Sequence, residues 1–315
     1  MVSASSDHST GNHQDSEQGH PRVKFVSGEY AKFEKLVLPE GVIGPEAVTF
    51  GGVAAPGPYT MADQRILKYW NNGTHAGFST MSVTSPPWSE WECGGVSHAD
   101  RSRLIGCGQP VDLSYYPNND VLYISDAEFG ILSVGMEGGL ASVLVAGEYN
   151  NTNGIDVDLL TGNIYFSSFF ALRTTYQKVS VLMSNLGDCG GPAVSIDGTF
   201  VLVPDNFNSR VLKYWLVGPK ADTNEVLMNL PGKTNRIKRG ETPGEFWVAA
   251  SRWIDVKEGK MFASAGMRFN SDGVVLETID FFAQYTDNQA SVVQEKDGKL
   301  YVGSYLTNFI GVYSN

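Results

Sequence analysis

The 315-residue sequence has little cysteine, little histidine and no long apolar run. Three of its five histidines (His8, His13 and His20) lie in the first twenty residues, which leaves His75 and His98 for the rest of the chain. This scarcity, and the lack of a Gly-x-Ser-x-Gly phrase, argue against a Ser-His-Asp hydrolase triad. No Cys/His spacing indicates zinc, and no glycine-rich phosphate loop occurs. No run reaches the roughly 18 apolar residues of a membrane-spanning helix.

Acidic residues outnumber basic ones by 34 to 23, which gives a formal net charge of −11. A negative chain is repelled by nucleic acid and by anionic membrane surfaces, so neither is expected as a partner. The charge is consistent with a cationic or amine ligand, although the need for solubility explains it equally well. Residues 1–21 are polar, with almost nothing to bury, and are expected to be disordered.

The cysteines and glycosylation signals indicate one location and the N-terminal residues another. Cys93 and Cys107 bracket a polar loop, and a bridge across a loop of that size would contribute roughly 3 kcal/mol. Asn72 and Asn150 each begin an Asn-x-Thr sequon. These features favour an oxidising compartment, whereas the first twenty residues lack the apolar stretch of a secretory signal. Either the N-terminus is incomplete, or the protein is cytosolic with free thiols.

One phrase occurs twice in the chain. Arg65–Trp70 (RILKYW) returns as Arg210–Trp215 (RVLKYW), and each copy is soon followed by glycine. Its alternation of apolar and polar residues favours a half-buried strand. Recurrence of such a phrase indicates a repeat architecture.

Short β-rich phrases of this kind recur along the chain between Gly/Asp/Asn turns, which is typical of hairpins. They are Gly57–Trp70, Val121–Val134, Asn163–Phe170, Phe200–Trp215, Glu245–Ala250 and Lys299–Tyr313. About six repeats of roughly four strands predict an all-β, six-bladed β-propeller spanning residues 22–315, with a β-sandwich as the alternative. One blade is expected to be shortened, because only Lys178–Met183 is a strand candidate between Phe170 and Val194.

Several phrases, in order, resemble the strictosidine synthase-like family over about residues 36–313. They are Gly44–Phe50, Gly57–Thr60, Cys107–Pro110, Leu122–Ala127, Gly138–Ala141, Arg210–Pro219, Ile237–Arg239, Gly244–Val248 and Gln294–Tyr301. The resemblance implies a six-bladed propeller with an axial pocket, a Cys93–Cys107 disulfide and a vacuolar or secretory location. It also implies a Pictet–Spengler condensation of an aryl-ethylamine with an aldehyde, in which a glutamate is the base and aromatic residues hold the indole.

This sequence departs from the family pattern at the residues that carry the chemistry. The catalytic glutamate of the family is matched by Ser291, and a hydroxyl without a proton-accepting partner is a poor base near neutral pH. Two expected aromatic positions are Asn153 and Asn206. The pocket is therefore expected to be more polar, with Asn153, Asn206, Asp205 and Tyr305 as substrate-binding candidates.

Other carboxylates are candidates for the missing base. On an extended strand Asp287, Ser291 and Glu295 share a face, so these three are the catalytic candidates. The plainer interpretations are a loop residue for Asp287, a hairpin turn for Glu295 and a buried, turn-stabilising carboxylate for Asp205.

A metal site is not expected, and neither is a cofactor. Glu46 and Asn153 resemble Ca²⁺ ligands of more distant, lactonase-type propellers. The further ligand positions are Gly190 and Asn235-Arg236, and an arginine there opposes a dication.

Three hypotheses follow for function. The first is a monomeric lyase of alkaloid biosynthesis that condenses a small amine with an aldehyde. The second is a propeller that binds a small molecule or a protein without catalysis. The third is a lactone or ester hydrolase. A vacuolar or secretory glycoprotein is the expected setting, with the cytoplasm as the alternative.

Overall fold

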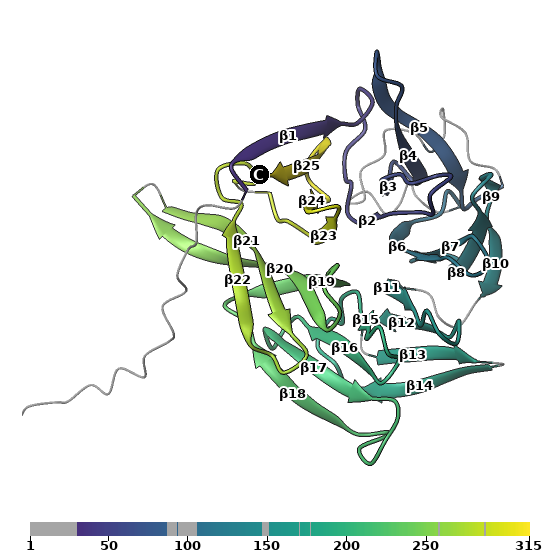
Figure 1. The fold of residues 1–315 in the computed structure, drawn as a ribbon, viewed down its shortest axis with the longest axis vertical. Coiled ribbons are helices and arrows are strands. Elements are labelled where there is room, and N and C mark those ends of the chain that lie inside the picture. Colours follow the sequence, from purple (N-terminus) through teal and green to yellow (C-terminus); the bar gives the residue numbers. More distant parts are fainter. Residues whose placement is uncertain are drawn as a thin grey trace, which may run out of the picture.

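Six small sheets surround a central axis in this computed structural model (Figure 1). It describes residues 30–86, 93, 106–146, 151–169, 171–176, 178–257, 259–286 and 288–315. The predicted six-bladed propeller is therefore confirmed. The predicted disordered segment 1–21 lies outside the described residues. Within the described residues, no helix is both long and apolar enough to cross a membrane.

Each blade runs outward from a strand at the axis. Blade 1 comprises β2 (Val48–Thr49), β3 (Tyr59–Ala62), β4 (Arg65–Asn71), β5 (Ala76–Val83) and the added β9 (Gly139–Leu140). Blade 2 comprises β6 (Pro110–Tyr116), β7 (Val121–Asp126), β8 (Gly130–Gly135) and β10 (Ser142–Val145). Blade 3 comprises β11 (Thr152–Val157), β12 (Ile164–Ser168), β13 (Ala171–Tyr176) and β14 (Lys178–Ser184).

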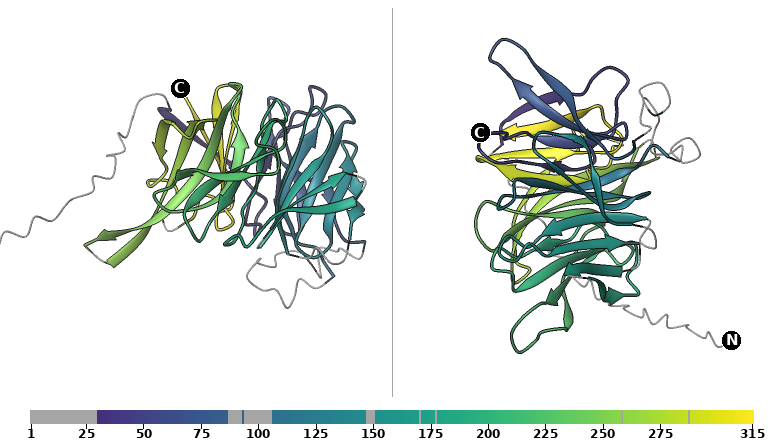
Figure 2. Two further views of the ribbon diagram at one scale, coloured as in Figure 1. Left: turned by 90° about the horizontal axis from the view of Figure 1, so that it is seen from below. Right: turned by 90° about the vertical axis from the view of Figure 1, so that its right-hand side faces the viewer.

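The second half of the ring follows the same plan. Blade 4 comprises β15 (Ala193–Val194), β16 (Phe200–Asp205), β17 (Arg210–Trp215) and β18 (Asn224–Asn229). Blade 5 comprises β19 (Lys233–Arg239), β20 (Glu245–Val256), β21 (Gly259–Asn270) and β22 (Val275–Asp280). Blade 6 comprises β23 (Val292–Lys296), β24 (Lys299–Gly303), β25 (Phe309–Ser314) and β1 (Lys32–Val37). The long hairpin of β20 and β21 extends past the ring (Figures 1 and 2).

The repeated phrase forms β4 and β17, the third strands of blades 1 and 4. Its lysine packs on an aromatic ring of the preceding strand in both copies. The Lys68 Nζ lies 5.7 Å from the centre of the Tyr59 ring, and the Lys213 Nζ lies 4.0 Å from that of Phe200. The register differs, because Lys68 lies directly opposite Tyr59, whereas Lys213 lies opposite Leu202 and reaches the Phe200 ring diagonally.

The hydrophobic core is divided into layers between neighbouring blades. One cluster joins blades 1 and 2 through Met61 and Leu113, and another joins blades 4 and 5 through Leu202 and Phe246. Similar clusters lie at the other four boundaries. Both faces of each sheet are therefore buried, and polar side chains gather at the axis.

Blade 3 has four strands, although the sequence predicted a shortened blade with one strand candidate after Phe170. The chain forms both β13 and β14, and only residue 177 separates them. The blade therefore keeps all four strands, and only the connection between β13 and β14 is short. The following run, Asn185–Pro192, holds no strand, as predicted.

Candidate functional site

A buried arginine lies on the axis of the ring. The Arg236 side chain comes from β19 and is 0% exposed. Its Nη2 donates to Glu46 Oε1 at 2.9 Å, to the carbonyl of Val111 and to that of Asn153. Its Nε lies 3.4 Å from Asp112 Oδ1. One guanidinium thus contacts blades 1, 2 and 3 from blade 5.

Asp112, in β6, is the buried acceptor at the centre of this network. Its carboxylate accepts hydrogen bonds from the backbone N–H groups of Leu113 at 2.9 Å and Ile155 at 3.1 Å. Lys238 Nζ donates to Asp112 Oδ1 at 2.9 Å and to the Leu113 carbonyl at 3.3 Å. Buried charges are stable only when paired and hydrogen-bonded in this way.

A second ion pair joins blades 3 and 5. Arg239 holds the Asp156 carboxylate with both terminal nitrogens, one of them at 3.0 Å. Asp156 also accepts from Ser114 Oγ and from the backbone N–H of Val194, both at 2.9 Å. Such bidentate pairs fix orientation as well as charge.

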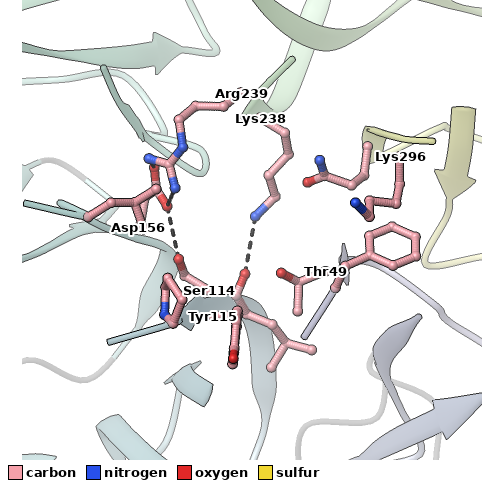
Figure 3. Close-up of a pocket in the computed structure, with 12 residues that line it drawn as sticks. Thr49, Ser114, Tyr115, Asp156, Lys238, Arg239 and Lys296 are labelled. Carbon is pink, nitrogen blue, oxygen red and sulfur yellow. Dashed lines mark hydrogen bonds and ion pairs between the residues drawn. The ribbon is translucent and has the colours of Figure 1, made fainter. Parts of the chain in front are cut away.

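A cavity of about 220 Å³ opens beside these pairs, where the inner strands end (Figure 3). We call this place the carboxyl end of the axis. Its lining combines basic, polar and apolar residues. The lining residues are Thr49, Phe50, Leu113, Ser114, Tyr115, Pro117, Asp156, Leu159, Lys238, Arg239, Gln294 and Lys296.

The opposite place, where the inner strands begin, holds Glu46, Ser291 and Tyr305, and we call it the amino end of the axis. Ser291 is fully buried, and its hydroxyl donates to the Glu46 carbonyl at 2.7 Å. Tyr305 donates to Gln289 Oε1 at 3.3 Å. Burial and the nearby Glu46 carboxylate raise the pKa of the Tyr305 phenol, which keeps it neutral.

The catalytic candidates do not form one group. Glu295 Oε2 accepts from Trp247 Nε1 at 3.1 Å and from the backbone N–H of Glu241 at 3.0 Å, so it contacts blade 5. Ser291 instead contacts the segment before β2, and the two side chains therefore face different neighbours. Ser291 directly precedes β23, which begins at Val292. Asp287 lies outside the described residues.

The substrate-binding candidates are held by other parts of the protein. Asn153 Nδ2 donates to the Cys189 carbonyl at 3.0 Å. Asn206 donates to Asp188 Oδ2 at 2.9 Å and accepts from the backbone N–H of Thr234 at 3.0 Å. Asp205 is fully buried and pairs with Arg210 at 2.7 Å, which matches the turn-stabilising interpretation.

The weak metal candidates are linked by the guanidinium. Arg236 bonds both the Glu46 carboxylate and the Asn153 carbonyl. A side-chain Cβ added at Gly190 would lie 1.7 Å from the Asn235 carbonyl oxygen, so no larger residue fits there. In the described part of the chain, no group of three or more His, Cys, Asp or Glu residues is arranged to hold a metal ion. The residues present do not fit a Ca²⁺ site.

The covalent predictions have mixed outcomes. Cys93 and Cys107 form the predicted disulfide. Asn72 is exposed in the turn between β4 and β5, whereas Asn150 lies outside the described residues. The remaining cysteine, Cys189, is buried, and burial raises the pKa of its thiol.

Sequence reasoning did not select the residues of the cavity. Lys238 and Arg239 entered only as part of a family phrase, and Asp112 and Asp156 were not singled out. The available signal was a charge inside an otherwise apolar strand, as in Val-Asp-Leu at 111–113 and Ile-Asp-Val at 155–157. A charge in such a pattern indicates a buried partner.

Curated relatives were found by comparison, whereas no family model matches the chain. Strictosidine synthase of Catharanthus roseus is 29% identical over 307 residues, covering 89% of this chain and 86% of the relative. Strictosidine synthase-like 12 of Arabidopsis thaliana is 32% identical over 314 residues, covering 91% of each. Strictosidine synthase-like 10 is 31% identical, covering 89% and 87%.

Among solved structures, a crystal structure of a nidogen/laminin complex aligns with a TM-score of 0.54, covering 76% of this chain and 79% of that one. At 14% identity this match concerns the fold alone. The sequence relatives, their near-complete coverage and the six-bladed ring agree with one another. The chain belongs to the strictosidine synthase-like family.

Proposed function

We propose that this protein binds a small molecule carrying a protonated amine at the amino end of the axis, without condensing it. The observation that carries the proposal is the position of Glu46. Its backbone carbonyl accepts the Ser291 hydroxyl at 2.7 Å, so an acidic residue from a neighbouring blade contacts the residue that matches the family's glutamate. Its side chain is 13% exposed, in contrast to the fully buried Arg236.

The surroundings of Glu46 suit an ammonium group. A carboxylate forms strong, charge-assisted hydrogen bonds with amines. Tyr305 adds an aromatic ring and a hydroxyl that stays neutral, because burial and Glu46 raise its pKa. Aromatic rings attract cations through their negative faces. The amine of a ligand would therefore have both a charged and an aromatic partner.

Loss of the family reaction is supported by the fate of its proton acceptor. Ser291 is buried, and its hydroxyl donates its hydrogen bond to a backbone carbonyl. Glu295 caps the neighbouring hairpin. Glu46 is bonded to Arg236 at 2.9 Å. Glu46 at the amino end and Glu295 near the other end of β23 therefore each have a structural partner.

The test is calorimetric titration with 2-phenylethylamine. We expect saturable binding that weakens at least tenfold in Glu46→Gln, because the amide removes the charge and preserves the shape. Glu40→Gln changes an exposed carboxylate outside the ring centre and should bind like the wild type. Because Glu46 also pairs with Arg236, Tyr305→Leu serves as a second variant and should weaken binding severalfold. Equal affinity in all four proteins would contradict the proposal.

A second candidate is the amine–aldehyde condensation itself, with Glu46 as the base. The partial exposure of Glu46 beside Ser291 favours it. The amine nitrogen would add to the aldehyde carbon and water would leave. The aryl carbon would then bond to the iminium carbon, and its released proton would pass to Glu46. Mass spectrometry of an aryl-ethylamine and aldehyde mixture after borohydride treatment distinguishes the two candidates. A spontaneous imine, which is also one water lighter than its parts, gains two hydrogens, whereas a cyclised product keeps its mass.

We also propose a secretory or vacuolar route. The Cys93–Cys107 disulfide supports an oxidising compartment, and exposed Asn72 is an accessible sequon. Expression in plant cells should give a mobility shift on N-glycosidase treatment that decreases in Asn72→Gln. An unshifted, fully reduced protein in the cytosol would contradict the route.

A further inference from the structure

The carboxyl end of the axis concentrates positive charge in an acidic protein. Three cations line its cavity, Lys238, Arg239 and Lys296, against one lining carboxylate, Asp156. The chain as a whole carries a net charge of −11. A basic cavity in such a chain does not follow from composition. Concave sites lined by one sign of charge focus the field and attract the opposite charge.

The three cations differ in how far their hydrogen-bond donors are already occupied by protein partners. Arg239 is committed to Asp156 through both terminal nitrogens. Lys238 has three donors; its two acceptors are Asp112 and the Leu113 carbonyl, and its amine projects into the cavity (Figure 3). Lys296 is 39% exposed and lies 3.2 Å from Asp297, which is 80% exposed. Lys296 also lies 3.8 Å from Glu241 Oε1, another partly exposed carboxylate. Exposed pairs of this kind are weak, so a ligand carboxylate can compete with both for Lys296.

Part of the cavity wall is apolar. Phe50, Pro117 and Leu159 contribute to it. The volume of about 220 Å³ equals that of about seven water molecules in the liquid. A ligand that fits must therefore be small and carry both an anionic head and an apolar body.

From these observations we propose that the carboxyl end of the axis is a binding site for a small organic monocarboxylate. Lys238 and Lys296 would bind the carboxylate, and the side chains of Phe50 and Leu159 would cover the apolar body. This site is separate from the proposed amine site and independent of it. The two lie at opposite ends of the inner strands, with Arg236 between them.

The probes are phenylacetate, its neutral isostere phenylacetamide, and sulfate. We expect phenylacetate to bind by calorimetry, at least tenfold more tightly than either of the others. Affinity should fall as salt increases, because the lysine ammonium groups act as charges. If phenylacetamide binds as tightly as phenylacetate, the negative charge of the ligand does not contribute to binding. Equal binding of sulfate would show that the apolar wall is not used. Either result would overturn the proposal.

Three variants locate the site. Lys238→Met should weaken phenylacetate binding at least tenfold, and Lys296→Gln should weaken it about threefold without touching the buried network. Lys299→Gln changes an exposed lysine of the same hairpin that does not line the cavity and should have no effect. Binding of 2-phenylethylamine should be unchanged in all three. If Lys296→Gln and a correctly folded Lys238→Met both bind phenylacetate with wild-type affinity, the proposal is overturned.

Discussion

The guanidinium of Arg236 contacts oxygen atoms from three other blades while lying wholly out of solvent. Removing it would leave the carboxylates of Glu46 and Asp112 without a shared partner. Lys238 would remain near Asp112, but within the part of the chain that the structure describes, Glu46 forms an ion pair only with the arginine. The residue therefore connects stability of the ring to the geometry of its centre.

We expect Arg236→Met to lower the free energy of unfolding by about 3–5 kcal/mol, as for other buried pairs that lose one partner. The matched control is Lys220→Met, which breaks the pair with Glu225. Those side chains are 58% and 45% exposed, so its loss should be below about 1 kcal/mol. Urea unfolding measures both. Similar losses in the two variants would show that the axial network adds nothing.

Tyr59 should make folding sensitive to alkali. Its ring is buried in blade 1, and burial followed by the charge of Asp120 raises its pKa to about 12. The unfolded chain releases this proton near pH 10, whereas the folded chain retains it. The stabilising contribution is therefore complete below about pH 10 and is lost as the pH rises towards 12.

Tyr59→Phe should therefore lose less stability than the wild type between pH 9 and pH 11. One proton accounts for at most about 1.4 kcal/mol per pH unit. At pH 9 the free energy of unfolding of the variant should be about 1 kcal/mol lower than that of the wild type, because the hydrogen bond from Tyr59 to the Ala55 carbonyl is gone. Urea unfolding at both pH values gives the comparison. Parallel losses in the two proteins would contradict the assignment.

At the scale of single residues, the sequence predicted which residues lie near the axis better than it predicted which partners their side chains contact. The family phrases placed Ser291, Asn153 and Asn206 near the inner strands, and the structure shows their side chains engaged with protein partners. It did not predict that Arg236 joins Glu46 to Asn153. Strand periodicity gives the face of a sheet, but it does not give the rotation of one blade relative to the next, which decides what meets at the axis.

At the scale of elements, neighbouring blades approach each other closely through their backbones at the axis. A Cβ added at Gly154 in β11 would lie 2.2 Å from the Gly191 Cα, in the segment before β15. Gly191 in turn bridges to Arg236 in β19, accepting from Ile237 at 3.0 Å and donating to Asn235 at 2.8 Å. Two glycines thus allow blades 3, 4 and 5 to meet at the axis.

Gly154→Ala should destabilise the protein by about 2 kcal/mol or more, since the added methyl group meets backbone that cannot rotate away. Gly135→Ala is the matched control, because Gly135 also lies in a strand, β8, and an added Cβ meets nothing within 4 Å. Its effect should remain within about 0.5 kcal/mol. Thermal unfolding of both variants tests the close approach, and equal melting temperatures would contradict it.

The elements themselves were largely predictable. Every β-rich phrase of the sequence coincides with strands of the ring, because alternation and turn residues are local signals. Blade 3 was predicted to be short, since a hairpin with one residue between its strands leaves no turn phrase to recognise. The apolar–polar pattern of β13 was also interrupted by Arg173, which bonds Ser168.

At the scale of the whole molecule, the two ends of the chain close the ring. β1 pairs with β25 over six residues, from Lys32 opposite Ser314 to Val37 opposite Phe309. The Phe33 ring lies 4.9 Å from that of Tyr313, and the Lys35 Nζ lies 4.2 Å from the centre of the Phe309 ring. Blade 6 is therefore built from both termini (Figure 1).

Removal of residues 1–37 should open the ring, whereas removal of residues 1–29 keeps β1 and serves as the control. The shorter chain loses a whole strand of ladder hydrogen bonds and the packing of Phe33, so its melting temperature should fall by more than about 10 °C. It also exposes β25 as an edge, which favours association between chains. Calorimetry and light scattering measure the two effects. If the chain beginning at Leu38 has the same melting temperature as the chain beginning at Tyr30 and stays monomeric, closure by β1 does not stabilise the propeller.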